Sequence, residues 1–254
     1  MAEPVTVERR GHVLVITITR PEVRNALNGA AARALATAAD ELDADDDLRA
    51  GVLTGAGGAF CTGMDLKAYL RGDKPDIEGR GFGGITITPP RKPLIAAVEG
   101  WVLAGGFELM LACDLVVAGD GSQFGVPEVK RAMVAGGGAA LLLPRRIPFT
   151  AAMELLLTGE RIDAHRAAAL GLVNPLVPDG TALGEALRLA GVIAANGPLA
   201  VTVTKQIARD QADWTVAEGW DRQAELYKPV FESRDAREGA AAFAEKRAPV
   251  WRGL

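Results

Sequence analysis

Cysteine, histidine and serine are scarce in this chain of 254 residues, and each shortage argues against one kind of chemistry. The two cysteines, Cys61 and Cys113, offer no disulfide framework, so a reduced protein of the cytoplasm is expected. Two histidines without a Cys-x-x-Cys or His-Glu-x-x-His pattern argue against zinc, and no metal is expected. The serines, Ser122 and Ser233, lie outside any Gly-x-Ser-x-Gly turn, which argues against a serine hydrolase.

Positive charge and long apolar runs are also lacking. The formal net charge is −4 at pH 7, whereas a nucleic-acid-binding protein normally carries a basic patch, so no nucleic-acid partner is expected. The longest apolar stretch, residues 94–119, is interrupted by Glu99, Glu108 and Asp114, which argues against a membrane span. Residues 1–5 show neither a basic nor an apolar targeting segment, so no signal peptide is expected.

The first two thirds of the chain alternate between strand patterns and helix patterns. Segments rich in β-branched and apolar residues predict strands over residues 5–9, 13–19, 50–54, 94–98 and 114–118. Alanine-rich and leucine-rich segments predict helices over residues 29–43 and 105–113. This alternation is typical of an α/β fold. With 49% apolar residues, the chain can bury the core of one large domain or two small ones.

The last third is almost entirely helical in pattern. Helices are predicted over residues 149–158, 164–170, 183–196, 199–209, 216–231 and 236–245. Only residues 172–177 look like a strand. Such a helical end is either a lid or an assembly surface, and we divide the chain into a core, residues 1–195, and a helical oligomerisation region, residues 196–254.

One irregular stretch, residues 71–92, is rich in glycine and proline. Long loops of this kind in compact domains are usually functional or mobile. Within it, residues 79–84 spell Gly-x-Gly-x-x-Gly, the pattern of a dinucleotide-binding turn. That pattern requires a strand before it and a helix after it, and neither is present, so no dinucleotide site is expected.

Two glutamates stand out because each lies among apolar residues beside a glycine-rich stretch. Glu108 is flanked by phenylalanine and leucine, and Glu128 follows Phe-Gly-Val-Pro. Burying a lone carboxylate is costly unless it is paired, hydrogen-bonded or used. Two such groups indicate acid/base chemistry on one small substrate. The alternative is that Glu108 favours a helix N-terminus and Glu128 is a surface residue after a proline.

Two glycine turns could present backbone N–H groups to a ligand. Residues 60–65 follow a strand and a glycine-rich turn, and residues 104–106 follow another strand and begin a helix. Unpaired N–H groups at such places can bind a developing oxyanion. The alternative is that both segments are tight turns with close backbone packing.

Taken together, these segments resemble the crotonase (enoyl-CoA hydratase/isomerase) family. The residues that carry the resemblance are Arg20-Pro21 with Asn25-Ala26-Leu27-Asn28, Phe60-Cys61-Thr62-Gly63-Met64-Asp65, 92–109 with Cys113-Asp114, 124–128, 157–173 and 243–247. The resemblance covers essentially the whole chain. A departure lies at residues 135–139, Ala-Gly-Gly-Gly-Ala, where the family often has Pro-Gly-Ala-Gly-Gly, and it leaves the acyl specificity open.

The resemblance implies a fold, a substrate and a reaction. The fold is an α/β crotonase-type spiral of ββα units with a helical C-terminal trimerisation region, assembled as a homotrimer or hexamer. The substrate is an acyl-CoA thioester, and no cofactor is expected because coenzyme A is part of the substrate. The reaction is the reversible syn hydration of trans-2-enoyl-CoA to 3-hydroxyacyl-CoA. The alternatives are a Δ3,Δ2-enoyl-CoA isomerase and a catalytically silent acyl-CoA-binding protein.

The resemblance also assigns roles to residues. Glu108 is expected to act as a base toward the water that adds at the β-carbon, and Glu128 to supply a proton to the α-carbon. The N–H groups of Met64 and Gly105 are expected to bind the thioester oxygen, and that of Gly136 to help hold the water. Residues expected to contact the acyl-CoA are Arg24, Ala26, Asp65, Leu66 and Lys246.

Overall fold

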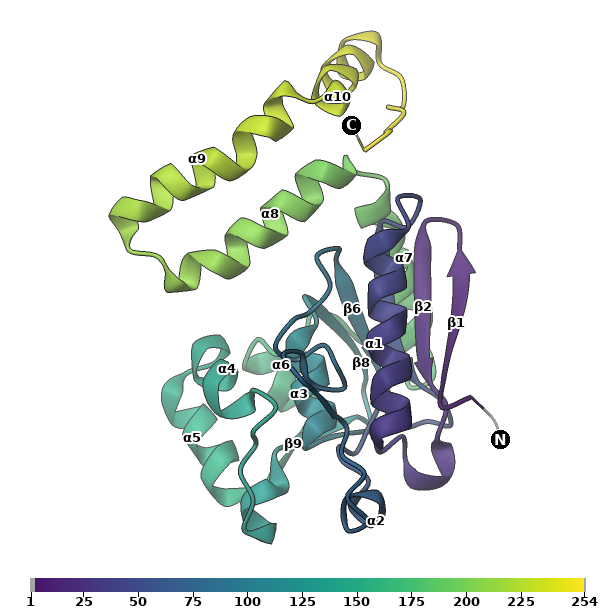
Figure 1. The fold of residues 1–254 in the computed structure, drawn as a ribbon, viewed down its shortest axis with the longest axis vertical. Helices are drawn as coiled ribbons and strands as arrows, with labels where there is room; N and C mark the ends of the chain where they lie inside the picture. The colour runs from purple at the N-terminus through teal and green to yellow at the C-terminus, as the bar shows by residue number, and fades with distance from the viewer. Residues whose placement is uncertain (1–2, 254) are drawn as a thin grey trace.

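The computed structural model describes residues 3–253, which are built around a six-stranded sheet (Figure 1). In spatial order its strands are β1 (Val5–Arg10), β2 (Val13–Ile18), β3 (Ala50–Gly55), β6 (Leu94–Val98), β8 (Leu115–Gly119) and β11 (Leu176–Val177). The first pair is antiparallel, and all the other neighbours run parallel. Parallel strands need crossover connections, which here contain the helices.

Both faces of the sheet are covered, which explains why its central strands are apolar on both sides. One face packs against α7 (Ala182–Ala194), whose buried Ala182, Ala186 and Ala190 recur every four residues and so lie on one side of the helix. The other face packs against α1 (Gly29–Ala44), within the larger of two apolar clusters. The small alanine side chains of α7 let that helix approach the sheet closely.

A second, smaller row of strands lies beside the large sheet. It contains β7 (Trp101–Leu103), β9 (Gln123–Gly125) and β10 (Arg161–Asp163); β7 and β9 are parallel. On the other side of β7, Cys61 forms a parallel bridge with Val102 and so extends the row. The three parallel members therefore have their carboxyl ends at one edge.

The chain visits the two rows in turn and forms a spiral of ββα units. From β6 it enters β7 and then α3 (Gly105–Ala112), and from β8 it enters β9 and then the short helix η2 (Pro127–Arg131). From β3 it passes Cys61 and reaches α2 (Leu66–Tyr69). This confirms the ββα spiral expected from the sequence.

The remaining elements are mostly helical. Near the core they are η1 (Pro21–Val23), the hairpin strands β4 (Asp76–Ile77) and β5 (Gly81–Phe82), α4 (Ala139–Arg146), α5 (Phe149–Thr158) and α6 (Ala164–Ala169). The chain ends in α8 (Pro198–Asp210), η3 (Gln211–Asp213), α9 (Val216–Glu232) and α10 (Arg234–Glu245). These last four helices, which we call the C-terminal arm, extend away from the sheet (Figure 1).

The long elements agree with the sequence patterns, and the short ones were missed. The strands β7, β9 and β10 have three residues each, too few to show a period. The strand predicted over residues 172–177 shrinks to β11 because Leu172 and Val173 turn into the core. The boundary predicted at residues 195–196 falls between α7 and α8. Whether the two parts act as separate units stays a prediction.

Within residues 3–253, no single helix is both long and apolar enough to cross a bilayer. α7 followed by Pro198–Asp213 meets the length and composition as a pair, but the two segments are bent by 108° at their break. α7 itself packs against the large sheet.

Candidate active site

The start of α3 presents one backbone N–H group. Ala104 precedes the helix with φ 52° and ψ −127°, a left-handed conformation that costs a residue with a Cβ about 1–3 kcal/mol. Its N–H donates to Gly125 O at 2.9 Å, which ties the turn to β9. Gly105 begins the helix, so its N–H has no intrahelical acceptor, and it finds none elsewhere among residues 3–253.

A second N–H group comes from the segment before α2. Leu27 N–H donates to Gly63 O at 2.7 Å, and Asp65 N–H donates to Leu27 O at 2.8 Å. In this parallel bridge the N–H of Met64 faces away from Leu27, and the described part of the chain offers it no acceptor. The segment touches the turn before α3, because a Cβ on Gly63 would lie 2.9 Å from the Gly105 nitrogen. Two adjacent turns therefore each supply an unpaired donor suited to one oxyanion.

Glu108 lies in the first turn of α3 and is only 4% exposed. Its Oε1 accepts a hydrogen bond from Ala139 N–H at 3.1 Å. The pKa of Glu108 is raised to about 7, mainly by burial and in smaller part by the charge of Glu128, while the hydrogen bond from Ala139 N–H opposes the increase. A carboxyl group with a pKa near neutrality can both take and release a proton at physiological pH.

Glu128 follows β9 and lies in the first turn of η2. The residue is half-buried, which is less exposed than the alternative of a surface residue after a proline implies. Its Oε2 is fully buried and has no hydrogen-bond partner within residues 3–253, and burial raises its pKa. A buried carboxyl oxygen without a partner is costly, which favours a use in chemistry. Both glutamates thus lie just beyond the carboxyl ends of neighbouring parallel strands, β7 and β9.

The sequence matches one known family along almost its whole length. The model of the family described as Enoyl-CoA hydratase/isomerase matches residues 8–253. The chain belongs to this family. The resemblance to crotonases is thereby confirmed, and the protein is an enzyme of the hydratase/isomerase type.

Individual relatives of this hydratase/isomerase-family enzyme agree with that assignment. The crystal structure of enoyl-CoA hydratase EchA1 from Mycobacterium marinum matches with a TM-score of 0.98 and 56% identity, covering 100% of both chains. Enoyl-CoA hydratase EchA19 of Mycobacterium tuberculosis is 46% identical over 96% of this chain and 94% of its own. Carnitinyl-CoA dehydratase of Proteus mirabilis is 37% identical over 100% of both chains. The crotonase-type fold is therefore confirmed.

Four of the five residues of this enzyme that were predicted to contact acyl-CoA lie together. Arg24 and Ala26 flank the turn that meets Thr62, whose N–H donates to Arg24 O at 3.2 Å. The Asp65 carboxylate accepts from Lys67 N–H and Ala68 N–H, both at 3.1 Å, and so caps α2, of which Leu66 is the first residue.

The Asp65 side chain also forms an ion pair with Arg20, at 3.0 Å. Burial opposes ionisation of this carboxyl, but the hydrogen bonds from Ala68 N–H and Arg20 hold its pKa below the ordinary value. Asp65 therefore shapes the loop that carries Met64. Lys246, the fifth predicted contact, directly follows α10 of the C-terminal arm. α10 lies far from α2, which Asp65 caps (Figure 1).

Two residues of the site were missed by sequence reasoning. The ring of Phe82, on β5, lies where a Cβ on Gly105 would be. A Cβ on Gly137 would collide with Glu108 Oε2 and lie 3.1 Å from the Phe82 Cβ. Gly136, predicted to position water, is more exposed than Gly137, and a Cβ there would lie within 4 Å of neither glutamate. The one available signal for Phe82 was a lone aromatic residue among glycines in the irregular stretch.

Residues 3–253 contain no group of three or more His, Cys, Asp or Glu side chains that could hold a metal ion.

Proposed function

We propose that this enzyme catalyses the reversible syn hydration of trans-2-enoyl-CoA to 3-hydroxyacyl-CoA. The observation that carries the proposal is the pair of buried carboxyl groups with raised pKa, Glu108 and Glu128, next to two unpaired N–H groups. Hydration needs a base for water, an acid for carbon and a site for the enolate oxygen, and these groups supply all three.

Each group has one task in the proposed reaction. The N–H groups of Met64 and Gly105 bind the thioester oxygen and stabilise the negative charge that it gains. Glu108, ionised, removes a proton from water while the water oxygen bonds to the β-carbon, and the N–H of Gly136 helps hold that water. Glu128, protonated, gives its proton to the α-carbon. Repulsion between two nearby carboxylates favours a state in which one group is ionised and the other is neutral.

Hydration explains the site better than its alternatives do. A Δ3,Δ2-enoyl-CoA isomerase needs to shuttle a proton but needs no positioned water, so one carboxyl group would suffice. A silent acyl-CoA-binding protein gains nothing from two buried carboxyl groups that disfavour their own charge. The names of the relatives, an enoyl-CoA hydratase and a carnitinyl-CoA dehydratase, describe the addition and the removal of water on CoA thioesters and support the proposal.

The proposed substrate is an acyl-CoA thioester bound by a cytoplasmic homotrimer or hexamer. Lys246 is expected to meet a phosphate of the coenzyme. Because α10 lies far from the site of its own chain, this contact is expected with the site of a neighbouring copy (Figure 1). No cofactor beyond the coenzyme A of the substrate enters the proposal.

The test is the loss of the conjugated-thioester absorbance when the purified enzyme meets crotonyl-CoA and longer trans-2-enoyl-CoAs. The variants Glu108→Gln and Glu128→Gln keep the side-chain shape but cannot transfer the proton, so kcat should fall about 10²–10⁴-fold in each. Near wild-type hydration in either variant would contradict the assignment. Faster formation of the conjugated thioester from 3-enoyl-CoA would favour the isomerase, and binding without turnover would favour the silent protein.

A further inference from the structure

The C-terminus of α3 is held by two arginines from distant parts of the chain. The last carbonyl groups of a helix have no intrahelical donors. Arg146, the last residue of α4, donates through Nη2 to Leu111 O at 2.7 Å and to Cys113 O at 3.3 Å. Arg209, on α8 of the C-terminal arm, donates through Nη2 to Ala112 O at 2.7 Å. The end of α3 opposite Gly105 and Glu108 is thus fixed from two directions.

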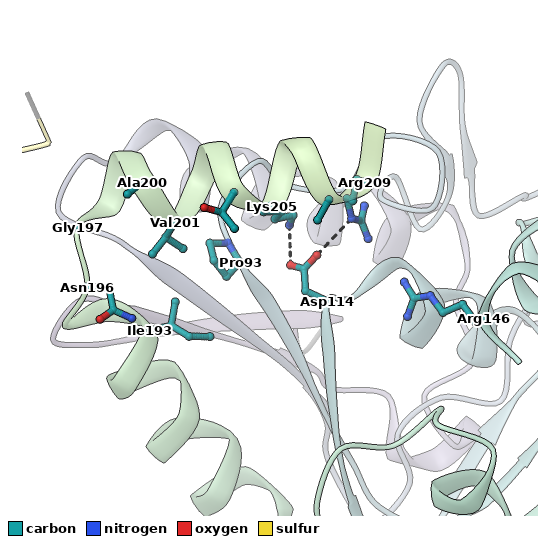
Figure 2. Close-up of a pocket in the computed structure, with 12 residues that line it drawn as sticks. Pro93, Asp114, Arg146, Ile193, Asn196, Gly197, Ala200, Val201, Lys205 and Arg209 are labelled. Carbon is teal, nitrogen blue, oxygen red and sulfur yellow. Dashed lines mark ion pairs between the residues drawn. The ribbon is translucent and has the colours of Figure 1, made fainter. Parts of the chain in front are cut away.

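Asp114 links the same helix end to the C-terminal arm. It lies between Lys205 Nζ, at 2.7 Å, and Arg209 Nε, at 3.3 Å, with Arg146 beside them in one cavity (Figure 2). Asp114 Oδ2 also accepts from Leu94 N–H at 2.8 Å, at the start of β6.

Lys205 completes the network and leaves no donor unused. Its side chain is 9% exposed, and besides Asp114 it donates to Pro90 O at 2.7 Å and Lys92 O at 2.9 Å. A buried ion pair is tolerated when its remaining groups are hydrogen-bonded in this way. We call Asp114, Arg146, Lys205 and Arg209 the α3 clamp.

We propose that Arg146 and Arg209 are positioning residues for the active site, because through the α3 clamp they fix where Gly105 N–H and Glu108 lie. The inference rests on the proposed function of those two groups. α3 has eight residues and is about 12 Å long, so it moves as one rigid rod and a shift at one end reaches the other. The cations also complement the negative end of the helix dipole. The turn at Ala104 is itself strained, and such a conformation persists only where the surrounding structure holds it.

The first test compares kcat and KM of Arg209→Ala, Arg146→Ala and Arg145→Ala with those of the wild type. Arg145 is the matched control: it precedes Arg146 on α4, is 59% exposed, and within residues 3–253 pairs only with Asp213 of the arm, at 3.3 Å. Displacing a catalytic group by about 1 Å can cost about 10²-fold in rate, so we expect kcat to fall about 10- to 100-fold in the two clamp variants. KM should stay within about threefold, and Arg145→Ala should match the wild type.

Arg209→Lys tests the geometry of the contact separately. It keeps the charge, but an ammonium group lacks the planar fork that reaches Asp114 and Ala112 O together, so an intermediate kcat is expected. Clamp variants that fold and show the kcat of Arg145→Ala would overturn the inference.

Amide hydrogen exchange tests the α3 clamp independently of catalytic activity. In Arg209→Ala, the exchange rates of α3 amides should rise more above their wild-type values than those of β2 and β3 amides. A loss of global stability alone would raise the exchange rates of all three elements equally. A uniform change would therefore refute the α3 clamp. If the wild type hydrates no enoyl-CoA, the proposed function fails, but the exchange pattern still shows whether Arg209 holds α3.

Discussion

Glu108 occupies a place that disfavours its own charge. Burial raises its pKa from an ordinary 4.5 to about 7. Between these two pH values the native state holds more protons than the unfolded state, so the free energy of unfolding falls as pH rises. Above about pH 7 the full penalty is present, and the shift corresponds to at most about 3 kcal/mol. The enzyme thus holds its proposed base at a cost to its own stability.

The variant Glu108→Gln should therefore be more stable than the wild type at pH 8, by up to about 3 kcal/mol, although it loses activity. Below pH 7 the wild-type carboxyl becomes neutral, so the difference should shrink and almost vanish near pH 4.5. Urea unfolding of both proteins at several pH values between 4.5 and 8 measures it. Glu41→Gln, at an exposed position of α1, is the control for the loss of one carboxyl group. If the free energies of unfolding of Glu108→Gln and the wild type differed by the same amount at every pH, the difference could not come from the buried charge of Glu108.

At the scale of elements, the connection between η2 and α4 shapes the space around Glu108. Gly137 leaves no room for a Cβ, because Glu108 Oε2 and the Phe82 Cβ lie beside it. Its neighbour Gly136 has room, since the nearest atom to a Cβ there is Val134 O at 3.7 Å. Neither glycine has a left-handed φ, so alanine meets no backbone strain at either position. The two glycines therefore differ only in their surroundings.

This difference predicts that alanine substitution lowers kcat at one of the two glycines and leaves it unchanged at the other. Gly137→Ala should push Glu108 aside and lower kcat by about 10²-fold, the usual effect of a displacement of about 1 Å. Gly136→Ala keeps both the space and the backbone N–H, so it should retain nearly the wild-type kcat. The measurement is kcat for hydration by the two variants, with circular dichroism to check that both are folded. Equal losses would show that Gly136 has a requirement for glycine that its surroundings do not reveal.

At the scale of the whole molecule, the C-terminal arm exposes large apolar side chains. Trp220 on α9 is 69% exposed and Phe243 on α10 is 87% exposed. Apolar surface of this kind at the end of a chain favours association with another copy. Lys246 ends the arm, whereas its neighbour Arg247 is already bound to Glu238 and Glu245. Lys246 is therefore the better candidate for a contact with the coenzyme of a neighbouring copy.

Replacement of Lys246 should reveal this contact. Lys246→Ala should raise KM for an enoyl-CoA but not for an enoyl-pantetheine thioester, which lacks the nucleotide. Because the contact is exposed, the effect should weaken as salt concentration rises. Lys228→Ala, at an exposed position of α9, is the control and should leave both KM values unchanged. Equal effects of Lys246→Ala on both substrates would exclude a nucleotide contact, and a monomer in light scattering would contradict the assembly.

The sequence by itself determined the long elements and the chemical groups of the site. Helix periods predicted α1, α5 and α7–α10 because the spacing of apolar residues depends only on local geometry. Apolar neighbours singled out Glu108 and Glu128, because the cost of burying a charge is visible in the surrounding residues. The glycine turns indicated only the segments 60–65 and 104–106, and the family resemblance named Met64 and Gly105 within them. The family resemblance then joined these groups into one reaction.

Only the tertiary structure decided which distant residues meet. Phe82 lies against Gly105, Gly137 rather than Gly136 packs against Glu108, and Asp114 joins the C-terminal arm to α3. No local pattern encodes these contacts, because they arise from close packing between segments that are remote in the chain. The same holds for Lys246, whose distance from the site depends on where the arm extends (Figure 1). The sequence thus determined which groups can act, and the packing of the chain determined how they are held in place.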